Sequence, residues 1–282
     1  MKNNIAASLS IMISVLLCAS CELFRIDNYD GPTETFRGSV VDVATGECVL
    51  TDQTDNGTRI RLRELSWTAT EIPEPFTFRG MNDGTFQNTK LFKGNYNVEF
   101  IGPFIPMIRM DSQGNTIADE TKTIDLKGGV TELKIEVQPF LKVEWVGTPT
   151  VSNGRITASF KVTRTVTPEN FRAKMENVGG YNANWIEVSD VRLFVGPTIH
   201  VGLGLNDNRY SIVGNTTDPA NTVNFNNADF EALLGQTITV TTISNILSGR
   251  TMFIRAAARV RCPTDGVSRY NYNEAIRVDI PQ

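Results

Sequence analysis

The sequence is poor in the residues that most often carry catalysis or bind metals: its 282 residues include one histidine and four cysteines. A nucleophilic triad needs a base held in a cleft, and His200 lies in a strand-like stretch, residues 197–201. A surface or packed position is therefore the better interpretation of His200. After Cys21 no Cys-x-x-Cys pair indicates zinc, and no loop has EF-hand spacing. The sequence predicts no catalytic residue, no metal and no cofactor, and hence a protein that is not an enzyme.

The sequence also lacks a cluster of basic residues. Asp and Glu outnumber Lys and Arg by 31 to 27, which gives a net charge of −4. A mildly acidic chain of this kind argues against nucleic acid as a partner. Two cysteines, Cys48 and Cys262, fall in different halves of the chain, and we expect two separate thiols, buried or inert, rather than a disulfide.

No apolar run reaches the roughly 20 residues that a membrane-spanning helix needs. The longest, residues 5–17, follows Lys2 and ends in small residues before Cys21. This order is typical of a bacterial lipoprotein export signal, cut before Cys21, whose thiol then carries diacylglycerol. Ordinary signal-peptide cleavage that leaves Cys21 free is the alternative. We therefore expect a signal peptide over residues 1–20 and a lipidated linker over residues 21–34, with the membrane as a partner.

From residue 35 the chain has the pattern of short β-strands. Residues 58–63 alternate arginine with other side chains at a period of two, which is typical of a half-buried strand. Lys93-Gly94 marks a turn between two further strands, and no helical period is found before residue 139. Short strands separated by turn signals favour an antiparallel β-sandwich over residues 35–139.

Several motifs in this half are specific. They are Gly38-Ser39-Val40-Val41-Asp42, Thr45-Gly46-Glu47, Asp83-Gly84-Thr85-Phe86 and Leu91-Phe92-Lys93-Gly94-Asn95-Tyr96-Asn97-Val98. Together they resemble the opening, turn and strand motifs of the carboxypeptidase-regulatory or transthyretin-like β-sandwich. With Cys21, residues 28–30 and Pro32, the chain resembles a family of Bacteroidetes outer-membrane lipoproteins of unknown function.

That resemblance has implications for location and partners. Members of the family are commonly encoded beside outer-membrane glycan-import systems of the starch-utilisation type, and the family carries no catalytic motif. It implies a lipid-anchored protein of the outer membrane that faces the cell surface, with a glycan or the glycan transporter complex as partner. A periplasmic orientation is the alternative.

The second half, residues 140–282, also alternates, for example over residues 141–146 and 156–166. Thr167-Pro168 predicts a helix start, and residues 226–235 predict a short helix that ends at Gly235. The last strand pair resembles the final hairpin of a fibronectin type III-like domain. The expected fold class is all-β: two tandem β-sandwiches, transthyretin-like and then fibronectin III/Ig-like with short helical insertions, after the signal peptide.

The candidate binding residues are aromatic and amide side chains, because sugars stack on flat rings and hydrogen-bond to amides. The densest group is the stretch Gly179-Gly180-Tyr181-Asn182-Ala183-Asn184-Trp185, here called the aromatic loop. The alternative is that Trp185 anchors the following strand. Trp67 is a weaker candidate, and Trp145 is expected in the core because it lies on an alternating strand. Tyr270 and Tyr272 share a strand face and fit either a rim or a packed position.

These patterns predict a non-catalytic surface lipoprotein that assists polysaccharide capture and uptake at the outer membrane. The alternative is a structural spacer or adhesin-like stalk, in which the sandwiches only set a distance from the membrane.

Overall fold

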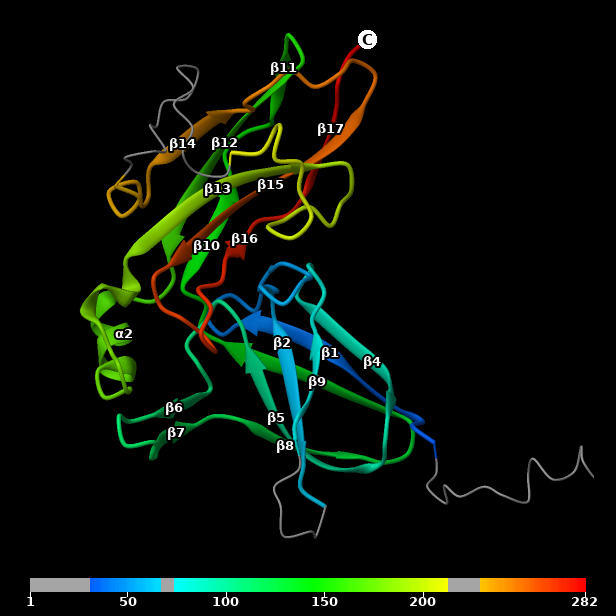
Figure 1. Ribbon diagram of the computed structural model, residues 1–282, viewed down its shortest axis with the longest axis vertical. Coiled ribbons are helices and arrows are strands. Elements are labelled where there is room, and N and C mark those ends of the chain that lie inside the picture. Colours follow the sequence, from blue (N-terminus) through cyan, green and yellow to red (C-terminus); the bar gives the residue numbers. More distant parts are fainter. Residues whose placement is uncertain (1–30, 67–73, 213–228) are drawn as a thin grey trace, which may run out of the picture.

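The computed structural model describes residues 31–66, 74–212 and 229–282, which form two stacked β-sandwiches (Figure 1). The strands are β1 (Glu34–Asp42), β2 (Arg59–Glu64), β3 (Phe76–Arg79), β4 (Thr85–Leu91), β5 (Gly94–Ile101), β6 (Ile108–Met110), β7 (Thr116–Asp119), β8 (Lys122–Leu126), β9 (Val130–Val137), β10 (Leu141–Trp145), β11 (Thr150–Ser152), β12 (Arg155–Arg164), β13 (Val188–Gly196), β14 (Thr237–Thr241), β15 (Thr251–Val260), β16 (Asn271–Tyr272) and β17 (Ile276–Asp279). The helices of the described ranges are α2 (Pro168–Met175) and the 3-10 helix η1 (Ala183–Ile186). The expected all-β fold class is confirmed.

The N-terminal sandwich packs the sheet β4-β1-β9 against the sheet β3-β2-β5-β8. β1 pairs antiparallel with β4 and parallel with β9, so the chain returns to its first strand at the end of this unit. Along β5 every second side chain is buried through Tyr96, Val98 and Phe100, because one face of the strand meets the opposite sheet; Ile101 at the end of the strand is buried as well. Phe86 and Phe100 lie in contact in the core, with ring centroids 5.2 Å apart.

The C-terminal sandwich consists of two packed four-stranded sheets. One has the order β10-β12-β11, with β14 also paired to β12, and the other has the order β13-β15-β16, with β17 also paired to β15. β12 alternates through buried Ile156, Ala158, Phe160 and Val162. β15 is buried along most of its length, which its small Ala side chains permit. The predicted helix start is present: the side chain of Thr167 accepts a hydrogen bond from the backbone N–H of Asn170 and caps α2.

The helix predicted over residues 226–235 is wrong for its described part. Residues 229–235 form turns whose backbone hydrogen bonds span three residues, from Leu233 to Phe230 and from Leu234 to Glu231. The N–H of Gly235 donates to the carbonyl of Val162 on β12, so it is not available for the helical hydrogen bond to the carbonyl four residues earlier. Strands β6, β7 and β11 and helix η1 are additions that the sequence patterns did not indicate.

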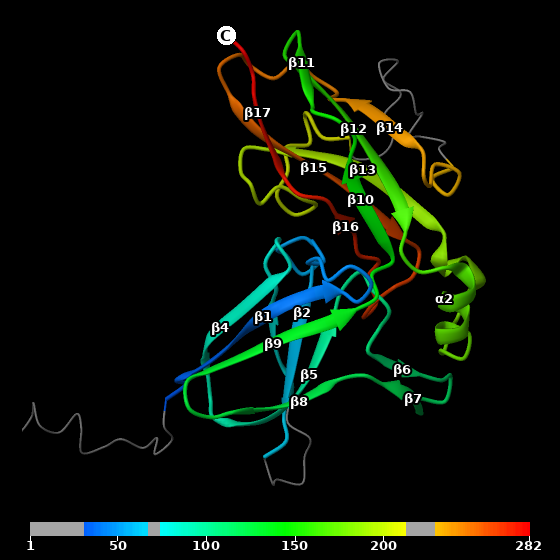
Figure 2. The same ribbon diagram turned by 180° about the vertical axis from the view of Figure 1, so that it is seen from behind.

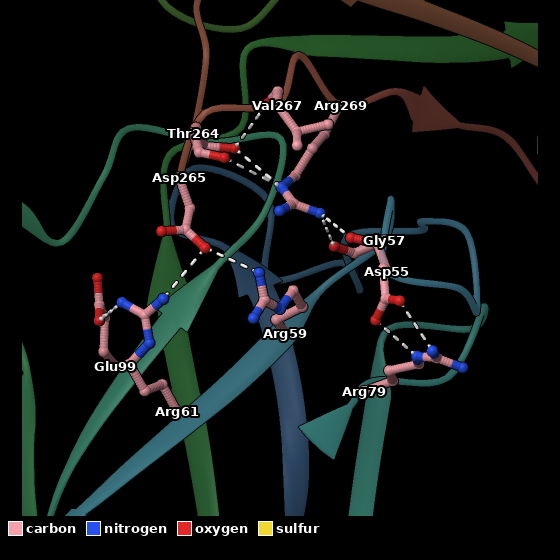
Figure 3. Close-up of polar contacts among 10 residues, drawn as sticks. All are labelled: Asp55, Gly57, Arg59, Arg61, Arg79, Glu99, Thr264, Asp265, Val267 and Arg269. Carbon is pink, nitrogen blue, oxygen red and sulfur yellow. Dashed lines mark hydrogen bonds and ion pairs between the residues drawn. The ribbon is translucent and has the colours of Figure 1, made fainter. Parts of the chain in front are cut away.

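The two sandwiches lie one above the other along the longest axis, and both views place β16 beside the loop between β1 and β2 (Figure 1; Figure 2). We call residues 50–58 the junction loop. Arg269, 2% exposed, donates to the carbonyl oxygens of Asp55 and Gly57 in this loop, the latter at 2.9 Å (Figure 3). Hydrogen bonds to these carbonyls replace part of the hydration that the guanidinium loses, and burial lowers the pKa of Arg269.

A second contact across the junction is ionic. The Asp265 carboxylate oxygen Oδ2 lies 2.8 Å from Arg59 Nη1 and 3.1 Å from Arg61 Nη2, both on β2 (Figure 3). Arg61 Nη1 also lies 2.9 Å from Glu99 Oε2 on the neighbouring strand β5. All four side chains are at least partly buried, so these ion pairs are less screened than surface pairs.

A third contact depends on two glycines. Gly202-Leu203-Gly204 of the C-terminal sandwich lies against the junction loop. A Cβ at Gly204 would lie 2.3 Å from Thr54 Cγ2, and one at Gly202 would lie 2.7 Å from Asp52 Oδ2. The backbone N–H of Gly204 donates to Asp52 Oδ2 at 3.2 Å. The close approach that makes this bond leaves no room for a side chain.

Tyr270 and Tyr272 are packing residues, which settles the choice that the sequence left open. They are 1% and 5% exposed and lie about Phe194, with ring centroids 6.0 Å and 5.9 Å from its ring. The hydroxyl of Tyr270 donates to Asp190. No helix in the described ranges is long and apolar enough to cross a membrane. The predicted signal peptide and most of the predicted linker, with Cys21, lie outside the described residues.

Candidate functional site

A cleft of about 970 Å³ lies where the two sandwiches meet, and we call it the junction cleft. The N-terminal sandwich contributes the end of β1 with the residues that follow it, and the turn before β4. The C-terminal sandwich contributes β10, a loop after β13, and β16 with the residues that follow it. The lining of the cleft includes Asp42, Glu47, Asp83, Lys142, Glu144, Trp145, His200, Arg255, Tyr272, Asn273 and Glu274.

Trp145 is the tryptophan of the junction cleft. It is the last residue of β10 and packs against the C-terminal core, as its place on an alternating strand predicts, but it is only half-buried there. Its indole Nε1 donates to the carbonyl oxygen of Glu274 at 2.9 Å, and its ring meets Phe160 edge-to-face, with centroids 6.3 Å apart. β10 alternates as expected, but it ends at the cleft, where the inward side of its last residue is only partly covered. The two contacts fix the ring in one orientation.

Two asparagines, Asn271 on β16 and Asn273 just after it, hold the walls of the cleft together. Asn271 accepts a hydrogen bond from the N–H of Leu141 at 3.2 Å and donates to the carbonyl of Pro103 at 3.1 Å. Asn273 Oδ1 accepts from the N–H of Ala256 at 2.8 Å. Asn273 Nδ2 has no hydrogen-bond partner in the part of the chain that the structure describes. The cleft is thus lined by amides that are largely committed to backbone groups.

Arg255 forms part of the cleft wall and is 2% exposed. It donates to three carbonyl oxygens: Thr51 at 2.9 Å, Asn82 at 2.8 Å and Asn273 at 2.7 Å. Burial lowers the pKa of its guanidinium to about 10. The arginine therefore joins both sandwiches at the back of the cleft, with its donors directed at the backbone.

The aromatic loop brings its two rings together, and both are half-buried. Tyr181 and Trp185 are half-buried against the C-terminal core and meet edge-to-face, with centroids 5.9 Å apart and planes at 75°. Asn182 Oδ1 accepts from the N–H of Asn184 at 2.9 Å and caps η1, so this amide has a structural role. Asn184 is exposed. The loop does not line the junction cleft.

The remaining candidates are placed as follows. Trp67 lies outside the described residues. His200 is exposed, on the loop after β13, and lines the junction cleft. Within residues 31–66, 74–212 and 229–282, no group of three His, Cys, Asp or Glu side chains could hold a metal ion.

Sequence reasoning missed the junction cleft as a whole. One signal was available: Arg255 interrupts the otherwise apolar run Phe253-Ile254-Arg255-Ala256-Ala257-Ala258. A charge inside a buried strand needs partners, so it points to a contact from outside that sandwich. The identity of that contact, the junction loop some 200 positions earlier, is not readable from spacing.

Residues 34–138 match the family described as protein of unknown function (DUF3823), N-terminal domain. A crystal structure of a DUF3823 family protein from Bacteroides uniformis is 44% identical, covers 89% of this chain and 100% of its own, and superposes with a TM-score of 0.79. The chain belongs to the DUF3823 family.

Two more distant structures share the fold. A DUF3823 family protein from Parabacteroides merdae is 20% identical, with 89% and 100% of the two chains covered and a TM-score of 0.57. A Bacteroides uniformis protein, provisionally described as carbohydrate binding, is 19% identical with the same coverage and a TM-score of 0.61. No curated protein matches the chain.

Proposed function

We propose that this DUF3823 protein is a lipid-anchored, non-catalytic accessory of glycan uptake at the outer membrane, and that it binds carbohydrate in the junction cleft. The export signal that ends at Cys21 supports the lipid anchor. The family resemblance supports the association with glycan import. The distant relative that is provisionally described as carbohydrate binding is compatible with a glycan as ligand.

The observation that carries the proposal is the position of Trp145 in the junction cleft. A sugar ring presents C–H groups on its faces and hydroxyls on its rim, so its sites combine an aromatic ring with polar side chains. Trp145 is half-buried and held by Glu274 and Phe160, while Glu144 and His200 line the same cleft. A volume of about 970 Å³ is in the range of small-molecule sites.

The test is a titration of the protein without its signal peptide and Cys21, residues 22–282, with a panel of polysaccharides. Binding is monitored by tryptophan fluorescence. A saturable change with one glycan class is expected. This form omits Cys21, so the protein stays in solution and aggregation through an acyl chain does not occur.

Trp145→Ala and Trp185→Ala form a matched pair. Both remove a half-buried indole that packs on the C-terminal core and meets a second ring edge-to-face, so their effects on stability should be similar. We expect Trp145→Ala to weaken glycan binding about tenfold or more, and Trp185→Ala to leave it unchanged. Tyr181→Ala and Trp67→Ala complete the set.

The outcomes separate the candidate sites. Loss of binding in Trp185→Ala or Tyr181→Ala, with Trp145→Ala unaffected, would move the site to the aromatic loop. Loss in Trp67→Ala alone would move it outside the described residues. Release of shorter sugars from any glycan of the panel would contradict the non-catalytic assignment.

The anchor and the exposed face need separate experiments. Cys21→Ser in the full chain should release the protein from the membrane fraction if the thiol carries lipid. Protease treatment of intact cells should remove a surface-facing protein and spare a periplasmic one.

A spacer is the second candidate function, and the junction favours it. The sandwiches are stacked along the longest axis (Figure 1), and Arg255 and Arg269 each join them through buried hydrogen bonds. A stalk needs such a fixed joint. Absence of binding to every glycan of the panel would favour this alternative.

A further inference from the structure

The basic side chains that line the junction cleft are already bonded within the protein. Lys142 Nζ lies 3.0 Å from Glu47 Oε2 on the N-terminal sandwich and 3.3 Å from Glu144 Oε1 on its own strand. The hydrogen bond with Glu47 raises the pKa of Lys142, so the lysine keeps its proton. This lysine links both sandwiches at the edge of the cleft.

Arg255 is the second cation, and its donors point at backbone. Its three nitrogens donate to the carbonyl oxygens of Thr51, Asn82 and Asn273, and the side chain is 2% exposed. An incoming anion could bind this guanidinium only by breaking hydrogen bonds that join the sandwiches. Neither cation is therefore ready to receive a carboxylate or a sulfate.

Carboxylates are more numerous around the same cleft. Five acidic residues line it: Asp42, Glu47, Asp83, Glu144 and Glu274. Glu47 and Glu144 are neutralised in part by Lys142, whereas Glu274 and Asp83 are exposed. With two cations against five carboxylates, the cleft presents an excess of negative charge.

We infer that the junction cleft selects neutral glycans and discriminates against uronate-containing and sulfated ones. This inference rests on the proposed function, and it adds the chemical class of the ligand. Sugar hydroxyls donate readily to carboxylates, so a neutral chain is bound without loss of the internal ion pairs. An anionic chain meets like charge and no unengaged cation, a juxtaposition that costs affinity and suppresses wrong partners.

The experiment uses dextran, galactan, mannan and xylan, each with a sulfated derivative, together with polygalacturonate. Affinities for the soluble protein, residues 22–282, are measured at low ionic strength and pH 8, where charge repulsion is least screened. We expect a neutral glycan to bind and its sulfated derivative to bind at least about tenfold more weakly. Added salt should narrow this gap, because it screens the repulsion.

A charge reversal locates the effect. Glu274→Lys should raise the affinity for the sulfated derivative, relative to that for the neutral glycan, about tenfold, because it replaces a repelling carboxylate by a cation. Glu136→Lys is the matched control, since Glu136 is exposed on β9 and does not line the cleft. An equal gain in both variants would mean a general effect of net charge and would overturn the assignment to the cleft.

Two other outcomes are distinct from each other. Tighter binding of polygalacturonate or of a sulfated glycan than of any neutral one would overturn the selectivity and leave carbohydrate binding in place. Binding of no glycan, neutral or charged, would overturn the proposed function and this inference with it.

Discussion

The guanidinium of Arg255 lies over the ring of Tyr272, 4.5 Å from its centroid. The two residues come from neighbouring strands, β15 and β16, and the phenol of Tyr272 reaches on to Asp52 in the junction loop, at 3.4 Å. The pair thus connects the buried sheet of one sandwich to a loop of the other. The cation is stabilised by a ring and by carbonyl groups and has no direct carboxylate partner among its hydrogen bonds.

We expect Arg255→Met to destabilise the protein by about 3 kcal/mol or more, because it leaves three buried carbonyls without donors. Arg255→Lys should recover only part of this loss, since an ammonium cannot reproduce the planar fork of donors. Urea unfolding of residues 22–282 measures both. Arg277→Met is the control, because the Arg277–Asp279 pair is 63% exposed on each side. Equal unfolding midpoints for Arg255→Met and Arg277→Met would contradict the assigned role.

Local patterns were sufficient to predict the fold class. The alternation in β2 and β12, the turn at Gly94 and the Thr167 cap are signals within ten residues, and each corresponds to the observed element. They succeed because period and capping depend on neighbouring residues. The helix prediction for residues 229–235 failed because the N–H of Gly235 donates to the carbonyl of Val162, a residue far away in the sequence.

The site could not be predicted in the same way. Trp145 is bonded to Glu274, 129 positions later, and the cleft forms only when both sandwiches meet. The alternation of a strand indicates which of its faces points inward, but it does not indicate at which residue the opposite sheet stops covering that face. The aromatic loop, by contrast, was recognisable because its members are consecutive. Consecutive aromatics are equally compatible with packing, and edge-to-face packing is how Tyr181 and Trp185 lie.

Gly204→Ala should destabilise the junction, since the new Cβ would lie 2.3 Å from Thr54 Cγ2. We expect a loss of about 1–3 kcal/mol in the free energy of unfolding. Thr54→Ala removes that methyl group. In the double variant the new Cβ at position 204 would then lie 3.3 Å from the Cβ of position 54, in place of the 2.3 Å contact with Cγ2. The double variant should therefore be more stable than Gly204→Ala alone. Additive losses in this cycle would place the strain elsewhere.

The two described thiols should differ in reactivity. Cys48 is exposed, whereas Cys262 is buried and burial raises its pKa to about 12. At pH 8 a thiol reagent should modify Cys48 in the folded protein because its sulfur is accessible, although partial burial and then Asp83 raise its pKa and slow the reaction. Cys262 should react only after unfolding, because its thiol is covered and the thiolate is the reactive form. Cys48→Ser gives the control, in which the fast phase is lost.

The raised pKa of the Cys262 thiol also predicts how the free energy of unfolding depends on pH. Above its ordinary pKa of 9.0 the unfolded chain loses this proton while the folded chain keeps it. The folded state then binds more protons, so the free energy of unfolding falls as pH rises from 9. Cys262→Ala should show a smaller decrease between pH 8 and 10 than the parent, measured by urea unfolding with Cys48→Ser as the common background. A slope that is unchanged by Cys262→Ala would show that another group titrates.

Asp265→Asn tests the ionic contact across the junction without a change of shape. Asp265 has a φ of 53°, a left-handed conformation that asparagine also adopts, so the substitution removes charge alone. It breaks the pairing with Arg59 and Arg61, and we expect a loss of about 1 kcal/mol at low ionic strength that shrinks as salt is added. Asp279→Asn is the control: its pair with Arg277 is 63% exposed on each side, and the asparagine oxygen can still accept from Thr251, so the loss should be smaller. A loss in Asp265→Asn that is independent of salt would mean that hydrogen-bond geometry, rather than charge, holds the two sandwiches together at this point.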